Sequence, residues 1–407
     1  MKPKNKDILF LCQFFYPEYI SSAMLPFDTA KYLTDQGYSV GVLCGYPKEY
    51  REGADVPERE YVDGVDIHRI KYAQLGREKI LGRIINYFSF VIFMLFHIRE
   101  AKEYKTIILY SNPPLLPIVA LLCKKLYKTK LVYVSYDIYP EIAIRTNTIG
   151  ESGLTAKVFR SINRHFFKKV DKVVALSEDM QDFLRENRNV TKDKVYVIPN
   201  WYEDCRKNEV HQTAVLGQLP EDAFIISYLG NLGTCQNADI IVDLAKKLQV
   251  QQKIYLVIAG HGNKLEHLKD TVEKENLENV VVFPFLHGDD YQTVLEKSSM
   301  FLVTLVSGLQ GLCAPSKIYA YLMSGKPVIA AMDDGMEIAK DIMKYDAGIV
   351  CAGDSAEEIV NEITEVKSNR QRLDEMGDNA RKLFLDKYEK NICLHQYGEL
   401  IKDLLAE

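Results

Sequence analysis

The stretch of the sequence best suited to chemistry runs from Ser307 to Ala330 and reads SGLQGLCAPSKIYAYLMSGKPVIA. It predicts a loop, a short helix that begins at Ser316, and a strand that begins at Pro327. Ser316 follows Pro315 and is a typical N-cap residue. Lys317 would then stand in the first helical turn, where the helix dipole disfavours a cation. An anion bound at the helix start, such as a phosphate group, would explain that cation.

The same residues also fit a helix that only packs. In that alternative, Tyr319, Leu322 and Met323 are core residues and Lys317 has no ligand. This stretch alone does not separate the two interpretations, so the elements around it have to decide.

Length and composition limit the class of protein. A chain of 407 residues is too long for one ordinary core, which predicts two domains. A hydrophobic fraction of 47% with 26% charged residues is typical of a soluble globular protein. The eight cysteines show neither CxxC pairs nor metal-ligand spacing, which predicts a reducing cytoplasm, no disulfide framework and no metal site. No signal peptide is expected, because the run ILFLC after the basic start has the length of a strand.

Charge is distributed unequally along the chain. Residues 1–205 carry 30 Lys and Arg against 25 Asp and Glu, while residues 206–407 carry 21 against 31. A basic amino-terminal half favours an anionic membrane surface or an anionic acceptor, although ordinary surface variation explains the same difference. Nucleic acid is not an expected partner, because the basic residues are dispersed and the pI is about 6.0.

The most apolar segment is Ile80–Ile98. Its charge-free part, Ile84–Ile98, has 15 residues, fewer than the ~20 that a helix needs to span a bilayer. Two interpretations remain open, a core helix or an interfacial helix flanked by Arg77, Lys79 and Arg83. The aromatic face of such an interfacial helix would consist of Tyr87, Phe88, Phe90, Phe93 and Phe96.

In the first half, strands alternate with helices. Strand Ile8–Cys12, a helix from about Met24 to Gln36 and strand Ser39–Cys44 predict a βαβ unit of a parallel sheet, whose ligands bind at the carboxyl ends of the strands. The first loop ends in the small residues Ser21 and Ser22, which would let a ligand approach the backbone. No GxGxxG dinucleotide fingerprint is present.

Another strand, Leu131–Ser135, is followed closely by Asp137. Its carboxylate is therefore expected at the edge of the sheet where ligands bind. The structural alternative is a cap for the helix that follows.

A second βαβ series follows a boundary near Pro199–Trp201. Strand Ala223–Leu229 leads into GNLG (Gly230–Gly233), and strand Ile254–Ala259 leads into GHG (Gly260–Gly262). Glycines in a short turn ahead of a helix form a cradle of phosphate size, although tight turns use the same residues. We therefore expect two parallel-sheet domains that face each other across a ligand-binding cleft.

Taken in order, these motifs resemble a known family. The segments are FYPE with SSA, DQGYSV, SNPP, YDIYPE, IPNW, YLGNLG, GHG and APSKIYAYLMSGKPVIA. Together they resemble family 4 glycosyltransferases of the GT-B fold, which has two Rossmann-like domains. The similarity is to bacterial enzymes of O-antigen, capsule and exopolysaccharide synthesis, and within them to the fucosaminyltransferase-like branch.

The resemblance implies a reaction and a division of labour. A hexosyl or N-acetylhexosaminyl group would move with retention from a nucleotide-sugar, usually UDP-linked, without a metal or cofactor. Residues 1–200, with a returning helix at 386–407, would bind the acceptor, and residues 201–385 would bind the donor. We expect a polyprenyl-diphosphate-linked or other saccharide acceptor and a cytoplasmic protein, peripheral on the inner face of the cytoplasmic membrane. No oligomeric state is predicted.

The resemblance also assigns residues. Asp137 and Lys317 would be catalytic, and Ser21, Ser22 and Asn112 would bind the acceptor. The donor-binding residues would be Gly230, Asn231, Gly233, Gln236, Gly260, Gly262, Phe285, Leu286, Pro315, Ser316, Tyr319 and Glu337.

Four positions depart from the family pattern. Many relatives carry two glutamates eight positions apart, where this chain has Leu312 and Ala320. Many also carry Arg and Lys five positions apart, where this chain has Asn231 and Gln236. Lys317, backbone N–H groups and helix ends would then have to stabilise the negative charge of the donor diphosphate.

Alternatives remain open for the role of Glu337 and for the function of the protein. Glu337 either replaces a missing carboxylate near the donor or complements a helix dipole in the first turn. The lost glutamates and cations also fit a catalytically silent homologue that acts as a scaffold in a polysaccharide complex. A sugar-nucleotide epimerase of the GT-B fold is the third possibility.

Overall fold

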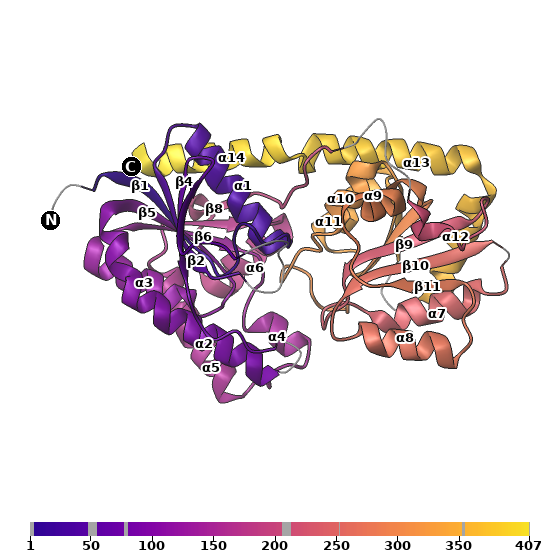
Figure 1. Cartoon of the computed structure of the whole chain (residues 1–407), viewed down its shortest axis with the longest axis horizontal. Coiled ribbons are helices and arrows are strands. Elements are labelled where there is room, and N and C mark those ends of the chain that lie inside the picture. The colour runs from indigo at the N-terminus through magenta and orange to yellow at the C-terminus, as the bar shows by residue number, and fades with distance from the viewer. Residues whose placement is uncertain are drawn as a thin grey trace. The chain divides into compact units, whose positions relative to one another are not determined.

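The protein consists of two α/β units (Figure 1). The first comprises Met1–Asn200, Gly311–Ala314 and Asn391–Glu407, and the second comprises Trp201–Gln310 and Pro315–Lys390. The computed structural model describes residues 4–47, 55–76, 80–205, 213–251, 253–351 and 355–406.

An eight-stranded sheet with the order β3-β4-β2-β1-β5-β6-β7-β8 forms the centre of the first unit. All neighbouring strands are parallel except β3 and β4, which form an antiparallel edge. Ile, Val and Leu are frequent in these strands, as expected for a parallel sheet covered on both faces. The strands are β1 (Lys6–Leu11), β2 (Val40–Gly45), β3 (Arg59–Val62), β4 (Val65–Ile70), β5 (Tyr104–Tyr110), β6 (Lys130–Ser135), β7 (Lys172–Ala175) and β8 (Val195–Val197).

Helices cover both faces of this sheet. Figure 1 shows α1 and α14 on one side and α2, α3 and α5 on the other. The helices are α1 (Ser21–Asp35), α2 (Ile80–His97), η1 (Ile98–Glu103), α3 (Leu116–Tyr127), α4 (Glu141–Arg145), α5 (Leu154–Phe167), α6 (Glu178–Arg188), η2 (Lys192–Lys194) and α14 (Lys390–Ala406).

The second unit contains a six-stranded parallel sheet with the order β11-β10-β9-β12-β13-β14. Its strands are β9 (Phe224–Asn231), β10 (Ile254–His261), β11 (Val280–Phe283), β12 (Met300–Thr304), β13 (Val328–Ala331) and β14 (Gly348–Cys351). Its helices are η3 (Ala214–Leu216), α7 (Ala238–Leu248), α8 (Leu265–Lys274), α9 (Gly288–Lys297), α10 (Ile318–Ser324), α11 (Glu337–Tyr345), α12 (Ala356–Ser368), α13 (Arg370–Leu383) and the π-helical turn η4 (Phe384–Tyr388).

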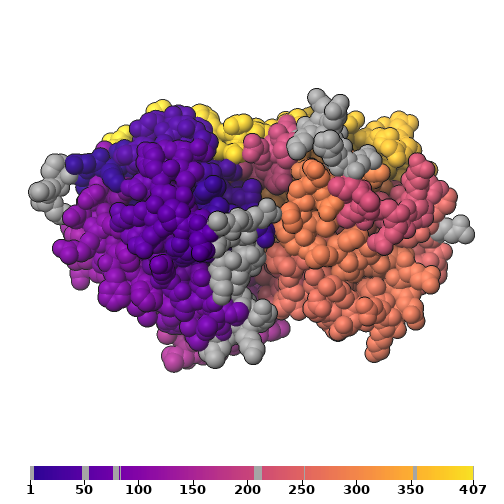
Figure 2. Space-filling view, in the orientation of Figure 1, coloured from indigo at the N-terminus to yellow at the C-terminus, as the bar shows by residue number. Residues whose placement is uncertain are grey.

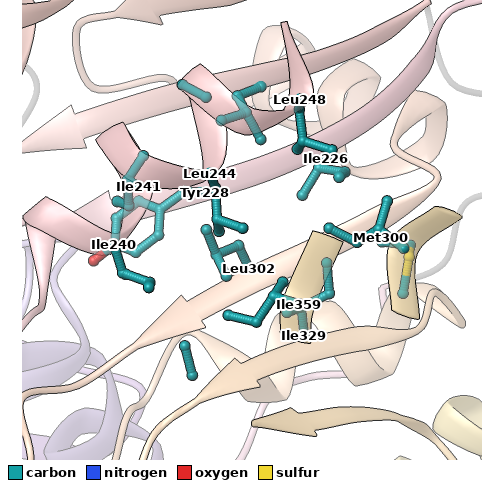
Figure 3. Packing of buried hydrophobic residues seen from close by; sticks show 14 of the residues in the cluster. Ile226, Tyr228, Ile240, Ile241, Leu244, Leu248, Met300, Leu302, Ile329 and Ile359 are labelled. Carbon is teal, nitrogen blue, oxygen red and sulfur yellow. The ribbon is translucent and has the colours of Figure 1, made fainter. Parts of the chain in front are cut away.

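Apolar side chains between this second sheet and its helices form the core of the unit (Figure 3). Ile226 and Leu302 project from neighbouring strands toward Leu244 of α7 and Ile359 of α12. All four are at most 1% exposed, so this core fixes the strands whose carboxyl ends carry the glycine turns.

The returning segment of the first unit begins at Asn391, whereas the sequence placed it at residue 386. Phe384 and Tyr388 explain the difference, because both are buried in a π-helical turn that belongs to the second unit. The remainder of α14 packs on the first unit, where its Leu404 carbonyl accepts a hydrogen bond of 2.6 Å from Lys130 Nζ.

Helix α2 has one packed side and one exposed side. Phe90 and Met94 are fully buried, whereas Phe88 is 54% and Phe96 71% exposed. By length and composition, Ile84–Glu103 is the only helical stretch of the described residues that is able to cross a membrane. Purple atoms from this region of the chain lie on the visible face of the first unit (Figure 2). Of the flanking cations, Arg77 and Lys79 lie outside the described residues, as does the side chain of Arg83.

Candidate functional site

Two glycine turns lie side by side at the carboxyl ends of β9 and β10. The strands pair in register, so that Gly230 stands opposite Gly260 and Asn231 opposite His261. Gly260 has φ +157°, and a Cβ there would lie 1.9 Å from the Gly230 carbonyl oxygen. Gly262 has φ +130°, and its Cβ would lie 2.3 Å from the Leu232 carbonyl oxygen. Only glycine allows the two backbones to approach this closely.

The side chain of Lys317 reaches the end of β9. Its Nζ donates to the Tyr228 hydroxyl and, over 2.9 Å, to the Asn231 carbonyl oxygen. The same atom lies 3.9 Å from the centroid of the Tyr228 ring, in a cation–π contact. A Cβ on Gly230 would be 3.4 Å from Lys317 Cε, so the lysine stem runs directly along the glycine turn.

Burial makes the positive charge of this lysine unfavourable. It lowers the pKa of Lys317 from 10.5 to about 7. The pKa of His261 is also lowered, first by burial and then by the nearby Lys317. A bound anion would reverse both effects, because it stabilises the charged forms.

The turn after β9 is held by its own side chains. Gly233 N–H donates to Gln236 Oε1 over 2.8 Å. Lys264, from the connection between β10 and α8, donates from Nζ to the Gln236 carbonyl oxygen over 2.6 Å. Lys264, His261 and Tyr228 were not predicted from the sequence. Their positions within three residues of a glycine turn were the available signal.

The remaining predicted donor residues are dispersed around these turns. Phe285 follows β11, and its ring lies 5.5 Å from that of His261. Leu286 is partly exposed beside it, and Pro315 is buried just ahead of α10. The structure therefore brings Phe285 to the GHG turn, which the sequence could not predict from strand order alone.

Ser316 is not the N-cap of α10, so that prediction is wrong. The helix begins at Ile318, whose N–H donates to the Pro315 carbonyl over 3.2 Å, and Lys317 takes the N-cap position without a side-chain cap bond. Lys317 thus meets the glycine turn through its long side chain, and the helix is too short to make a strong dipole.

The contacts of Tyr319 and Glu337 favour their structural alternatives. Tyr319 is 2% exposed, and its ring lies 5.0 Å from that of Tyr388. Glu337 stands in the first turn of α11 and forms an ion pair of 3.2 Å with Lys387.

In the first unit, Asp137 is held by its backbone at the carboxyl end of β6. Its N–H donates to Ser111 Oγ over 3.0 Å, and it forms an antiparallel bridge with Cys313. Ile138 N–H adds a hydrogen bond of 2.9 Å to the Leu312 carbonyl oxygen. Burial raises the pKa of Asp137 from 3.8 to about 6, which is the direction expected for a desolvated carboxylate.

The segment Gly311–Ala314 is therefore a strap that fixes Asp137 within the first unit. Gly311 N–H donates to Asp179 Oδ2 over 2.7 Å. Gly311 has φ +71°, and a Cβ there would lie 2.7 Å from the Asp179 carbonyl oxygen. Leu312 is 3% exposed, so the position where the sequence resemblance implies a glutamate is an apolar packing position here.

Polar groups without protein partners lie near other strand ends of the first unit. Asn112 Oδ1, just after β5, is buried and has no hydrogen-bond partner in the described part of the chain. Gln13, just after the neighbouring strand β1, is 1% exposed, and neither atom of its amide has a partner there either. Such groups cost free energy unless water or a ligand satisfies them.

Ser21 and Ser22 do not end a loop, so that expectation is wrong. Both belong to the first turn of α1, because the N–H groups of Ala23 and Met24 already donate to the Ile20 carbonyl, over 2.8 and 3.0 Å. Within the described ranges, no group of three or more His, Cys, Asp or Glu side chains is arranged to hold a metal.

Two family models together match most of the chain. The model described as Glycosyl transferase 4-like domain matches residues 27–201, and the model described as Glycosyl transferases group 1 matches residues 216–383. The chain belongs to the family 4 glycosyltransferases. The resemblance drawn from the sequence motifs is thereby confirmed.

Curated relatives and solved structures agree with this assignment. This glycosyltransferase is 23% identical over 352 residues to the probable glycosyltransferase WbjE of Pseudomonas aeruginosa, covering 84% of this chain and 86% of the relative. It is 23% identical over 330 residues to the putative colanic acid biosynthesis glycosyl transferase WcaI of Escherichia coli K12, covering 77% and 81%.

A solved structure shows the same fold. The Anabaena protein HepE, in complex with UDP and glucose, superposes with a TM-score of 0.70 at 16% identity and covers 98% of this glycosyltransferase and 100% of its own chain. The predicted GT-B architecture of two parallel-sheet domains is confirmed.

Proposed function

We propose that this glycosyltransferase transfers a sugar from a UDP-sugar to a lipid-linked saccharide during the synthesis of a cell-surface polysaccharide. The observation that carries the proposal is the contact of Lys317 Nζ with the Asn231 carbonyl oxygen at the end of β9, beside the glycine turns. A desolvated lysine that no carboxylate among the described residues neutralises favours an anion such as a diphosphate. The name of WcaI supports the polysaccharide, and the ligands of HepE support the UDP-sugar.

The second unit would hold the donor. Negative charge grows on the leaving diphosphate as the glycosidic bond breaks, so a fixed cation stabilises the transition state more than the ground state. Lys317 is held in place by Tyr228 and Asn231, and would therefore act without reorganising. In the retaining, front-face reaction of this proposal, the departing phosphate helps to deprotonate the acceptor hydroxyl, and the chain needs no metal.

The first unit would hold the acceptor through Asp137. With a pKa of about 6, this side chain is mostly a carboxylate at neutral pH. A carboxylate accepts a hydrogen bond from a sugar hydroxyl and stabilises positive charge at the reacting carbon. The strap at Gly311–Ala314 would keep it in place while the acceptor binds.

A peripheral position on the inner face of the cytoplasmic membrane would bring the protein to a lipid-linked acceptor. The exposed aromatic side of α2 supports this position, since its opposite side is packed in the core of the first unit. The excess of cations in residues 1–205 favours an anionic lipid surface.

A catalytically silent scaffold is the second candidate. Leu312 and Ala320 favour it, because the sequence resemblance implies glutamates at these two positions, and this chain has apolar residues that are only 3% and 2% exposed. Both positions are buried, so a glutamate side chain placed at either one would be desolvated.

Turnover of the Lys317→Ala variant tests the proposal. We expect a loss of transition-state stabilisation of roughly 2–4 kcal/mol, typical of one removed donor to a developing anion. The rate of UDP release in the presence of a polyprenyl-diphosphate-linked saccharide measures it, with Lys269→Ala on the surface of α8 as the control. An unchanged rate in the Lys317→Ala variant would remove Lys317 from the donor site.

A further inference from the structure

The turn Asn231–Gln236 has no Lys or Arg of its own, but positive charge reaches it from another loop. Lys264 reaches this turn from the connection between β10 and α8. Its backbone N–H donates to the Leu232 carbonyl over 3.1 Å, and its Nζ donates to the Gln236 carbonyl over 2.6 Å. Both ends of the residue are therefore fixed to the same turn, and the ammonium group lies beside Gln236.

We propose that Lys264 is a second diphosphate-binding cation of this glycosyltransferase, supplied to the turn from a different loop. The inference rests on the proposed function, since it takes the ligand to be a nucleoside diphosphate or its sugar. Lys317 approaches the turn at Asn231 and Lys264 approaches it at Gln236, so the two ammonium groups flank it.

The charges around the two lysines support this role. Among the described residues, neither Lys264 nor Lys317 forms an ion pair with a carboxylate, and the oxygen atoms that they contact are uncharged. Other lysines of the second unit differ. Lys269 pairs with Glu266 at 2.9 Å and Lys246 with Glu275 at 3.3 Å. Two uncompensated cations on one turn create a local positive potential that an anion would neutralise.

The backbone of the turn makes a side-chain cation necessary. Gly233 N–H already donates to Gln236 Oε1 over 2.8 Å, so it is not available to a phosphate oxygen unless Gln236 moves. A phosphate at this turn therefore depends on the lysine side chains more than in a cradle whose N–H groups all point to the ligand. The sequence positions of Lys264 and Gln236 are too far apart for a motif to have connected them.

Calorimetric titration of the full-length protein with UDP tests the inference, using the wild type and the Lys264→Met, Lys264→Arg, Lys317→Met and Lys269→Met variants. We expect Lys264→Met to weaken binding about tenfold, the size of one charge-assisted hydrogen bond. Lys264→Arg should keep most of the affinity, and Lys269→Met should match the wild type. Thermal unfolding of each variant shows whether it is folded.

The salt dependence of the UDP affinity separates an electrostatic role from a structural one. Salt weakens the attraction between a lysine and the diphosphate, so each cation that contacts the ligand makes the UDP affinity fall more steeply with salt concentration. The UDP affinity of Lys264→Met and of Lys317→Met should therefore fall less steeply than that of the wild type. The role of Lys264 would be overturned if the Lys264→Met variant bound UDP as tightly as the wild type does. It would also be overturned if Lys264→Met bound UDP more weakly with an unchanged salt dependence and Lys264→Arg did not restore the affinity. Failure of the wild type to bind UDP, GDP or dTDP would instead overturn the proposed function.

Discussion

Lys317 carries a charge that its surroundings disfavour until an anion arrives. In the protein without donor its pKa is about 7, lowered by burial, and no carboxylate among the described residues compensates it. Tyr228 and Asn231 hold the Nζ atom at the glycine turn and thus reduce the entropy that binding would otherwise lose. On the proposed function, Lys317 would bind the donor diphosphate, and its charge lowers the stability of the protein when no ligand is bound.

The affinity for a UDP-sugar should depend on pH through Lys317. The diphosphate of a UDP-sugar keeps its charge near neutral pH, so the lysine is the titrating partner. Below pH 7 Lys317 is already protonated and no longer contributes to the pH dependence, so only protonation of His261 would strengthen binding further. Above pH 7 binding has to take up a proton, so affinity should fall by up to about tenfold per pH unit.

Calorimetry at several pH values measures this dependence, and proton uptake is checked by repeating it in buffers of different ionisation enthalpy. The Lys317→Arg variant keeps its charge and should lose the pH dependence. A wild-type affinity that stays flat from about pH 6 to pH 9 would show that Lys317 does not contact the donor.

Asp137 should determine the acid limb of the reaction rate. Its pKa is raised to about 6 by burial, so the carboxylate is lost as the pH falls below that value. At saturating donor, the turnover rate should therefore fall about tenfold per pH unit below pH 6. Asp137→Asn, which keeps the shape without the charge, should reduce turnover about 100-fold and remove this limb. An acid limb that persists in Asp137→Asn, or donor affinity that falls as much as turnover, would make Asp137 a structural residue.

At the scale of elements, the strands were the most predictable part of the fold. Their runs of Val, Ile and Leu are local signals, and the strand predicted at Leu131–Ser135 is β6, which begins one residue earlier. Helix α13 was not predicted, because charged side chains make up half of it. Its buried face has only four apolar side chains, which are Leu373, Met376, Ala380 and Leu383. The starts of α1 and α10 were misplaced because neither has a side-chain cap.

The contacts of the two candidate sites could be predicted only in part. The glycine turns and the position of Lys317 were visible as short motifs, because each depends on a few adjacent residues. The strap at Gly311–Ala314 was not, since its bridge to Asp137 joins positions far apart in the chain. Lys264 escaped prediction for the same reason, because a hydrogen bond to a distant backbone carbonyl leaves no sequence pattern.

Helix α2 should bind the protein to anionic membranes. Phe88 and Phe96 are 54% and 71% exposed, so replacing both with Glu leaves the packed side unchanged and places charge in the apolar boundary of the bilayer. Sedimentation with vesicles that contain anionic lipid should show at least about tenfold weaker binding of the double variant. This follows from the lost burial of two aromatic side chains.

The control for α2 is Met343→Glu on α11, which is 50% exposed and should bind vesicles as the wild type does. Both variants replace exposed side chains, so their thermal unfolding should match the wild type. Equal sedimentation of wild type and the Phe88→Glu, Phe96→Glu double variant at low salt would remove α2 from membrane binding.

For the whole molecule, the division of charge corresponds to the division of proposed roles. Residues 1–205, which contain Asp137 and α2, carry the excess of cations, whereas residues 206–407, which contain Lys264 and Lys317, carry an excess of acidic groups. The chain passes from the second unit to the first at Gly311 and returns at Pro315. The residues that fix Asp137 therefore lie only a few positions before Lys317, so donor-side and acceptor-side residues depend on one short stretch of chain.

Mass spectrometry combined with NMR of the products from a panel of UDP-sugars shows whether a sugar is transferred, and with which anomeric configuration. Purified protein is incubated with each donor, a polyprenyl-diphosphate-linked saccharide and a metal chelator, with Lys317→Ala and Asp137→Asn as controls. We expect one donor whose sugar appears on the acceptor in its original anomeric configuration, and strongly reduced product in both variants. UDP-sugar binding without transfer from any donor, or a sugar altered on the nucleotide with no acceptor present, would contradict it.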